Sequence, residues 1–484
     1  MGVFVFVFLE SLLLATGVTP AVIWLAHRIN ALDRPGVRTV HGRPIARIGG
    51  VAIFLSAMVT IFTALFADSR LQEAFASLRL PLGMLLGMAT MVFLIGLTDD
   101  LRGLPARVKF LAETAGAVVL CLVGVRISSI AITDGFVVHL GSWGWVLTVL
   151  WIVGVTNAVN LSDGLDGLAG GVSAIACAVI AAFAVHSQNL IMAVLMLALL
   201  GGLCGFLFYN FNPAKVFMGD CGSLFVGFTI ASSSMMCLSK SSALVGLALP
   251  VLALGIPIFD TLFSILRRYL ERRSLFAPDR SHFHHRLLDL GLQQRHAVIA
   301  IYLATLLAAG MGLFMMVSRN ITSLVVFGCV LLLIVLLFRW VGAVHLDKTL
   351  NGLHDKYAFS HQQREDRKTF ENLQLQFRQV HDARQWWQAV CEAGRRMDFA
   401  WLSLKTTYAD GRTEEELWRS PQTSPDAQRI ITITIPLTNG TADASRQFEI
   451  ALWANGSIEA ASRRVTLFGR LLDESEAAVS QQTV

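Results

Sequence analysis

The chain has 484 residues, of which 54% are hydrophobic and only 15% are charged, and its formal net charge is +5. Its mean hydropathy of +0.60 excludes a single soluble core wrapped in a polar surface, and it favours a protein that crosses a membrane many times. The seven cysteines are scattered without paired spacing, so neither a disulfide framework nor a zinc site is expected.

Apolar stretches long enough to cross about 30 Å of hydrocarbon, roughly 20 residues each, recur between residues 3 and 341. By that criterion we expect about eleven membrane helices. The first stretch, residues 3–24, lacks the basic segment and the cleavage site of a signal peptide, so it is predicted to be a retained helix. The predicted fold class is therefore an all-α polytopic membrane protein with a soluble C-terminal domain.

Arginines are concentrated after the first span and in one later loop, and the positive-inside rule assigns such clusters to the cytoplasm. This predicts a plasma (inner) membrane protein whose N-terminus lies outside. An odd number of spans then leaves the C-terminus in the cytoplasm. The loops expected on the cytoplasmic side, which hold most of the unusual polar residues, are 27–48, 99–109, 157–170, 210–222 and 267–296.

Two adjacent carboxylates, Asp99 and Asp100, close the apolar run 82–98. Like charges repel unless a cation or a proton separates them, so a magnesium ion is their natural partner. The alternative is a pair of solvated carboxylates at a helix end, beside Arg102.

The next polar loop lies between two apolar stretches and contains Asp163 and Asp166, with Asn160 just before them. The two carboxylates lie one helical turn apart if the loop runs into the next helix, so both can face one ligand. An Asp-Gly repeat also forms tight turns, but a charged turn between membrane spans favours a functional site.

Residues 210–223 end another span with Lys215, Phe217 and Asp220. The lysine can pair with phosphate, and the carboxylate can bind a hard cation. Phe217 can stack on a flat base or pack in the core.

A later loop places Arg280, His282, His284 and His285 close together. No cysteine accompanies these histidines, so a positively charged cradle for a diphosphate is favoured over a zinc site. The alternative is a basic loop attracted to anionic lipid headgroups.

After Val341 the composition becomes polar. Residues 345–380 are predicted to form a solvated helix, and a small α+β domain follows that faintly resembles part of a GAF domain. Its predicted elements are helices at 384–397 and 458–478 and strands at 400–405, 430–437 and 447–453. No motif in this domain indicates its function. The expected division is a membrane domain at 1–341, a cytoplasmic helical linker at 342–383 and the small domain at 384–484.

Acidic positions, a lysine and a His/Arg loop on one membrane face predict transfer of a phosphorylated group to a membrane-bound acceptor. The motifs resemble the polyprenyl-phosphate N-acetylhexosamine-1-phosphate transferase family (glycosyltransferase 4). That family includes the enzymes that initiate O-antigen, enterobacterial common antigen and teichoic-acid synthesis, and the related MraY translocase. The motifs are Asp33-Arg34-Pro35 through Arg47-Ile48-Gly49-Gly50, Asp99-Asp100, NxxNxxDGxDGL from Asn157, NxxPAKVFMGDxGS from Asn210 and DRSHFHHRL from Asp279.

The resemblance implies a magnesium-dependent enzyme, with manganese as the alternative ion, that moves a sugar-1-phosphate from a UDP-N-acetylhexosamine to undecaprenyl phosphate and releases UMP. It implies that Asp220 is the principal metal ligand and that Asp99 deprotonates the lipid phosphate. The implied catalytic residues are Asp99, Asp100, Asp163 and Asp166. The implied metal ligands are Asp220, Asp99, Asp100 and Asp163. The implied substrate-binding residues are Asn160, Lys215, Phe217, Arg280, His282, His284 and His285.

The histidine loop is more similar to that of the O-antigen-initiating enzymes than to that of MraY, where three histidines are usually consecutive. This favours UDP-N-acetylglucosamine as donor in O-antigen or other cell-surface polysaccharide synthesis. UDP-N-acetylfucosamine, UDP-N-acetylquinovosamine and UDP-MurNAc-pentapeptide stay open, as does the choice between direct displacement and a covalent phospho-aspartate.

The non-enzyme alternatives are a scaffold that recruits glycosyltransferases and a secondary transporter, whose carboxylates would lie near the bilayer midplane. The expected partners are the UDP-sugar, undecaprenyl phosphate and the lipid bilayer, and no nucleic acid. A second copy of the chain and a cytoplasmic partner of the C-terminal domain are further candidates.

Overall fold

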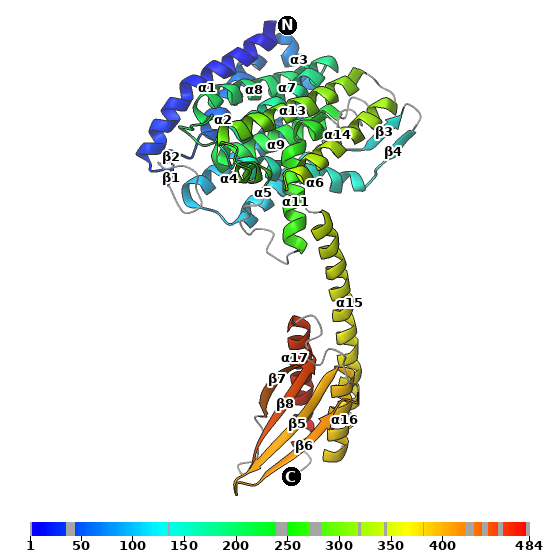
Figure 1. Cartoon of the computed structure of the whole chain (residues 1–484). Helices are drawn as coiled ribbons and strands as arrows, with labels where there is room; N and C mark the ends of the chain where they lie inside the picture. The colour runs from blue at the N-terminus through cyan, green and yellow to red at the C-terminus, as the bar shows by residue number, and fades with distance from the viewer. Residues whose placement is uncertain are drawn as a thin grey trace. The chain divides into compact units, whose positions relative to one another are not determined.

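The computed structural model divides the chain into two compact units, Met1–Thr349 and Leu350–Val484. Each unit is described by itself. Figure 1 shows the first as a bundle of helices and the second as a sheet accompanied by helices. The residues that the structure describes are 2–34, 44–133, 136–238, 249–270, 282–317, 321–342, 346–380, 382–421, 430–437, 444–453 and 458–480.

The first unit is almost entirely helical. Its helices are α1 (Gly2–Arg28), α2 (Gly50–Ala67), α3 (Ser69–Ser77), α4 (Arg79–Arg102), α5 (Ala106–Leu122), α6 (Trp143–Ser162), α7 (Leu168–His186), α8 (Leu190–Asn210), α9 (Gly219–Leu238), α11 (Gly255–Leu270), α12 (Phe283–Asp289), α13 (Gln294–Val317) and α14 (Ile321–Trp340). Two short antiparallel strand pairs join β1 (Leu32–Asp33) to β2 (Ile45–Ala46) and β3 (Ser129–Thr133) to β4 (Phe136–His139).

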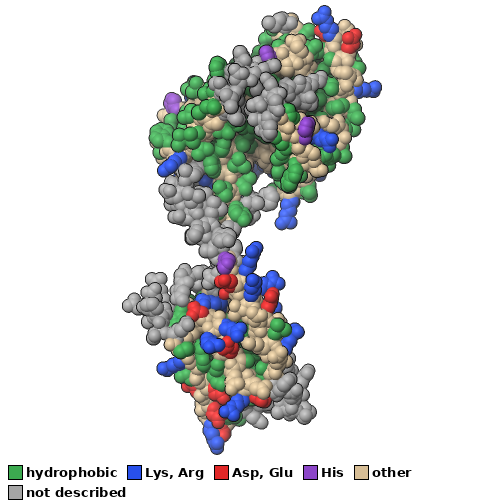
Figure 2. Space-filling view, turned by 90° about the vertical axis from the view of Figure 1, so that its right-hand side faces the viewer, with side chains coloured by type: hydrophobic (Ala, Val, Ile, Leu, Met, Phe, Trp, Pro, Cys, Tyr) green, Lys and Arg blue, Asp and Glu red, His purple; other side chains and the backbone are tan. Residues whose placement is uncertain are grey.

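Seven helices in the described part of the chain are long and apolar enough to cross a membrane, namely α1, α2, α4, α6, α7, α8 and the segment Gln294–Phe314 of α13. A shorter apolar segment, Val325–Trp340, lies in α14. Figure 2 shows many hydrophobic side chains on the described part of the visible surface of this unit. The predicted helical multi-pass membrane unit is confirmed, while the total of about eleven spans stays a prediction.

Helices α7, α8 and α9 form the centre of the bundle. In their most hydrophobic segments 78% of the residues of α7 and 72% of those of α8 are buried, against 22% for α1. Every residue of α9 from 221 to 237 is buried. A Cβ atom on Gly205 of α8 would lie 2.5 Å from the backbone oxygen of Leu12 in α1, so only glycine allows this approach. Small residues give membrane helices the close packing on which their association depends.

Glycines also bring α9 against α2 and α4. A Cβ on Gly50 of α2 would lie 2.2 Å from the backbone nitrogen of Gly222 in α9. A Cβ on Gly96 of α4 would lie 2.6 Å from the backbone oxygen of Asp220. Because the backbones touch at these points, the last turn of α4 lies beside the first turn of α9.

The second unit contains a four-stranded antiparallel sheet in the order β6-β5-β8-β7. The strands are β5 (Phe399–Tyr408), β6 (Thr413–Arg419), β7 (Ile430–Leu437) and β8 (Ala444–Trp453). The helices are α15 (Leu346–Phe377), which begins in the first unit, α16 (Ala383–Arg396) and α17 (Ile458–Ser480). In the core, Phe448 of β8 and Phe399 of β5 pack edge to face against Phe468 of α17.

The predicted helices and strands of this unit are confirmed by α15, α16, α17, β5, β7 and β8. Strand β6 was not predicted, because three successive glutamates, Glu414, Glu415 and Glu416, hide its alternation. Its neighbour β5 is a buried central strand, and β6 lies at the edge of the sheet with six of its seven residues exposed.

Candidate functional site

Asp100 joins the end of α4 to the start of α9. Its two carboxylate oxygens accept hydrogen bonds from the backbone N–H groups of Asp220 (3.0 Å) and Cys221 (2.9 Å). A carboxylate is stabilised at a helix N-terminus because the unpaired N–H groups carry partial positive charge. Arg47 Nε adds an ion pair at 3.1 Å. Both oxygens of this predicted catalytic and metal-binding residue therefore serve to fix α9.

Lys109, on α5, lies between the other two carboxylates of this cluster. Its ammonium Nζ is 2.8 Å from Asp99 Oδ2 and also forms an ion pair with Asp220. Asp99 accepts a further hydrogen bond from the backbone N–H of Leu104. The structure therefore brings the predicted residues Asp99 and Asp220 to one lysine that the sequence analysis did not single out.

Asn160 extends the cluster from the end of α6. Its side-chain amide donates to Asp220 Oδ1 (3.2 Å) and to Ser223 Oγ (2.8 Å). One turn earlier, Asn157 donates to Glu113 of α5, a carboxylate that is only 1% exposed. Glu113 was also missed, although it lies one helical turn after Lys109 on α5.

The two aspartates of the Asp-Gly loop have different surroundings. Asp166 Oδ2 accepts hydrogen bonds from Asn212 Nδ2 (2.9 Å) and from the backbone N–H of Ala214 (3.0 Å), so it ties this loop to the segment before α9. Burial and the nearby carboxylates of Asp220, Asp100 and Asp166 raise the pKa of Asp163 to about 8, although a hydrogen bond from the Gly219 backbone acts to lower it. Asp163 thus belongs with the carboxylate cluster, whereas Asp166 holds the loop.

The segment that contains Lys215 and Phe217 runs along residues 46–50. The Phe217 N–H donates to the Ala46 oxygen (2.7 Å), and the Phe217 oxygen accepts from the Gly49 N–H (2.9 Å). The side chain of Phe217 is half-buried, and Lys215 is exposed. These contacts explain why the motif after Asp33 and the motif before Asp220 belong to one site.

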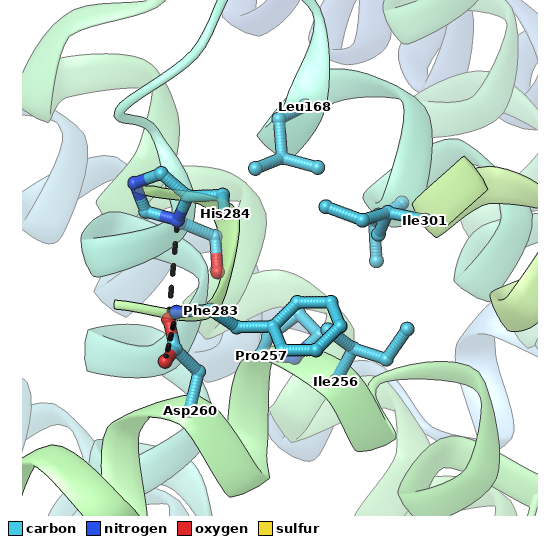
Figure 3. A pocket seen from close by; sticks show the side chains of 9 residues that line it. Leu168, Ile256, Pro257, Asp260, Phe283, His284 and Ile301 are labelled. Atoms are coloured by element: carbon cyan, nitrogen blue, oxygen red, sulfur yellow. Dashed lines mark hydrogen bonds and ion pairs between the residues drawn. The ribbon is translucent and has the colours of Figure 1, made fainter. Parts of the chain in front are cut away.

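The histidine loop is anchored on α11 by Asp260 (Figure 3). His282 Nδ1 lies 3.1 Å from Asp260 Oδ2, and the backbone N–H of Phe283 donates to Asp260 Oδ1 at 2.8 Å. His284 Nδ1 lies 3.9 Å from the same carboxylate. The sequence analysis missed Asp260, although an ionisable residue inside an apolar stretch indicates a functional group.

The predicted positive charge of this loop is only partly supported. His282 and His284 are buried, and His285 is half-buried. Burial lowers the pKa of His284 to about 3, so that histidine is neutral at neutral pH. Arg280 lies outside the described residues. The adjoining cavity in Figure 3 has a volume of about 10 Å³, room for no more than one water molecule, so it does not hold a substrate.

Magnesium fits the chemistry of the carboxylates in the cluster, since it prefers oxygen ligands. Within the ranges that the structure describes, however, no three His, Cys, Asp or Glu side chains converge closely enough to hold a metal ion. Asp100 is committed to α9, and the ammonium of Lys109 supplies the positive charge between Asp99 and Asp220.

Comparison with known proteins matches residues 82–238 to the glycosyl transferase family 4 model. The chain is 38% identical over 300 residues (61% of this chain, 80% of the relative) to a probable undecaprenyl-phosphate N-acetylglucosaminyl 1-phosphate transferase of Bacillus subtilis. It is 34% identical over 301 residues (58% and 75%) to the decaprenyl-phosphate N-acetylglucosaminephosphotransferase of Mycobacterium leprae.

A third relative, the phospho-N-acetylmuramoyl-pentapeptide-transferase of Streptococcus pneumoniae, is 35% identical over 195 residues, which cover 39% of this chain and 57% of the relative. The matched family region contains the ends of α4 and α6 and the start of α9, where the carboxylates, Lys109 and Asn160 meet. The chain therefore belongs to the polyprenyl-phosphate N-acetylhexosamine-1-phosphate transferase family, glycosyl transferase family 4.

Proposed function

We propose that the protein transfers N-acetylglucosamine-1-phosphate from UDP-N-acetylglucosamine to undecaprenyl phosphate and releases UMP. The observation that carries this proposal is the cluster in which Lys109 contacts Asp99 and Asp220 while Asn160 contacts Asp220. It combines acidic groups, a cation and an amide donor at the ends of membrane helices, as transfer of a phosphoryl group to a lipid requires.

In the proposed reaction an oxygen of the lipid phosphate attacks the phosphorus that carries the sugar, and the bond from that phosphorus to the UMP oxygen breaks. Asp99 would accept the proton of the lipid phosphate. Lys109 is positioned to offset the negative charge of the phosphoryl oxygens, and the exposed Lys215 to pair with the diphosphate. Phe217 would stack on uracil.

Magnesium, or manganese in its place, is part of this proposal. Asp220, Asp99 and Asp163 would have to move closer together to supply its oxygen ligands, since they do not converge closely enough in this structure and Asp100 is committed to the α9 backbone. When bound, such an ion offsets the charge of a diphosphate. Asn160 would hold Asp220 in place from the side of α6 through its 3.2 Å hydrogen bond.

The donor is proposed from the names of the relatives. The relatives from Bacillus subtilis and Mycobacterium leprae, matched over 80% and 75% of their own length, are named as transferases of phosphorylated N-acetylglucosamine, while the pentapeptide transferase is matched over 57% of its length. We place the reaction on the cytoplasmic face of the plasma membrane because of the arginine distribution, in a chain of about eleven spans whose N-terminus lies outside. The pathway is O-antigen or another cell-surface polysaccharide. A homodimer and a cytoplasmic partner of the second unit belong to the same proposal.

The test is UMP release by the purified protein with undecaprenyl phosphate, magnesium and a panel of UDP-sugars, with and without the lipid. Asp220→Ala should lower the rate at least about 100-fold, because it removes a group at the centre of the cluster. Asp289→Asn, at an exposed position in α12, is the matched control and should keep the rate. No lipid-dependent UMP release with any donor, from folded protein, would favour a scaffold or a transporter instead.

A further inference from the structure

We propose that Asp260 is a positioning residue that fixes the tautomer of His282 and holds the histidine loop against the Asp163-Gly164 turn. The inference rests on the proposed function, because it assigns the histidine loop to binding of the UDP-sugar. It concerns α11, which the predicted site did not include.

Asp260 is a carboxylate with 6% exposure, and burying such a charge is costly unless it is paired. Both of its oxygens are used. Oδ1 accepts from the backbone N–H of Phe283 at 2.8 Å, and Oδ2 lies 3.1 Å from Nδ1 of His282. Ser264 Oγ, one turn further along α11, lies 3.3 Å from the same Nδ1. The anchor therefore fixes both the backbone and the ring of the loop.

A carboxylate can only accept a hydrogen bond, so the Nδ1 of His282 must carry a proton in this arrangement. In the neutral ring the other nitrogen, Nε2, then carries the lone pair and can accept a hydrogen bond. The nitrogen that bears the proton in a histidine is commonly set by the bond that the opposite nitrogen makes. Asp260 thus determines which ring nitrogen of His282 can accept a hydrogen bond.

The same anchor places His284 against the acidic loop. A Cβ atom on Gly164 would lie 2.8 Å from His284 Nε2, so this ring touches the turn that follows Asp163. The rings of His282 and His284 are nearly parallel, at an interplanar angle of 6° and a centroid separation of 5.6 Å. Both rings are therefore held between Asp260 on one side and the Asp163-Gly164 turn on the other.

Asp260→Asn separates this role from a merely structural one. The N–H of Phe283 cannot change its role, so the amide oxygen of the new side chain must face it. The amide NH₂ then faces His282 and forces the opposite tautomer, with little change in shape. A loss of activity through the wrong histidine tautomer is the known consequence of such a change in a serine-protease triad.

The experiment compares Asp260→Asn with Asp289→Asn in the full-length protein. We expect Asp260→Asn to lower kcat/KM for UDP-N-acetylglucosamine about 10- to 100-fold and to leave the KM for undecaprenyl phosphate unchanged. His282→Asn keeps a donor toward Asp260 but lacks the second ring nitrogen, so it should show the same defect. The double variant should lose no more than either single one. Equal kcat/KM in Asp260→Asn and wild type would overturn the proposal.

A second readout needs no substrate. We expect diethyl pyrocarbonate to modify His282 more slowly in Asp260→Asn than in wild type, as measured by peptide mass spectrometry, because the reagent attacks an unprotonated ring nitrogen and the opposite tautomer carries its proton on Nε2. An unchanged modification rate of His282 would show that Asp260 does not set its tautomer. If the wild type releases no UMP with any donor, the proposed function fails, while this readout still decides whether Asp260 positions the histidines.

Discussion

The contact between α4 and α9 predicts that Gly96→Ala will damage the site without touching any of its side chains. The added Cβ would lie 2.6 Å from the backbone oxygen of Asp220 and 2.7 Å from the Cα of Cys221. Ordinary contacts begin near 3.4 Å, so α9 must move by about 0.8 Å. Because the obstructing atoms are backbone, no rotation of a side chain can relieve the clash.

The expected size follows from this displacement. Adding a methyl group to a fully packed contact costs about 1–3 kcal/mol of stability. The shift also draws the backbone N–H groups of Asp220 and Cys221 away from Asp100, whose bonds to them are now 3.0 and 2.9 Å. A misplacement of about 1 Å in a catalytic group can lower the rate about 100-fold, so UMP release should fall by that order.

Gly87→Ala is the matched control, since it lies on the same helix and has no atom within 4 Å of the added Cβ. It should keep full activity and be at least as stable, because alanine is favoured over glycine in a helix by about 1 kcal/mol. Thermal unfolding and lipid-dependent UMP release of both variants provide the assay. If Gly96→Ala and Gly87→Ala behave alike, the close approach of α4 and α9 does not position the site.

Two further predictions concern ionisable groups. Lys109→Met should lower UMP release about 100-fold or more. Removing one partner of a fully buried ion pair costs about 3–5 kcal/mol of stability, and the cost here should be smaller because the side chain of Lys109 is 20% exposed. Lys109→Arg should restore part of both, and wild-type rates in the Met variant would contradict the assigned role. For His284, whose pKa in the folded protein is about 3 against the usual 6.5, only the unfolded chain binds the proton between these values, so stability should fall as pH drops below about 6.5. The difference between the unfolding temperatures at about pH 5 and about pH 8 should be smaller in His284→Gln than in the wild type. The same difference in both proteins would contradict this explanation.

The sequence by itself determined the class of protein and the elements of the second unit other than β6. Length and hydropathy identify membrane helices because a helix in lipid must satisfy its own backbone and present apolar side chains. Strand β7 and helix α17 were predicted because their periodicity is local. The order of the motifs also placed the polar residues at the ends of predicted spans.

Only the tertiary structure decided what each polar residue contacts. Lys109 contacts Asp220, which lies 111 residues later in the sequence, and Asp100 accepts a hydrogen bond from the N–H of Cys221, 121 residues later. The sequence could not separate Asp100, which fixes a helix end, from Asp99, which faces a lysine. The physical reason is that contacts between helix ends depend on which backbones approach closely, as Gly50 and Gly96 allow here. Hydrophobic periodicity records which face of a helix is apolar, but not which helix packs against it.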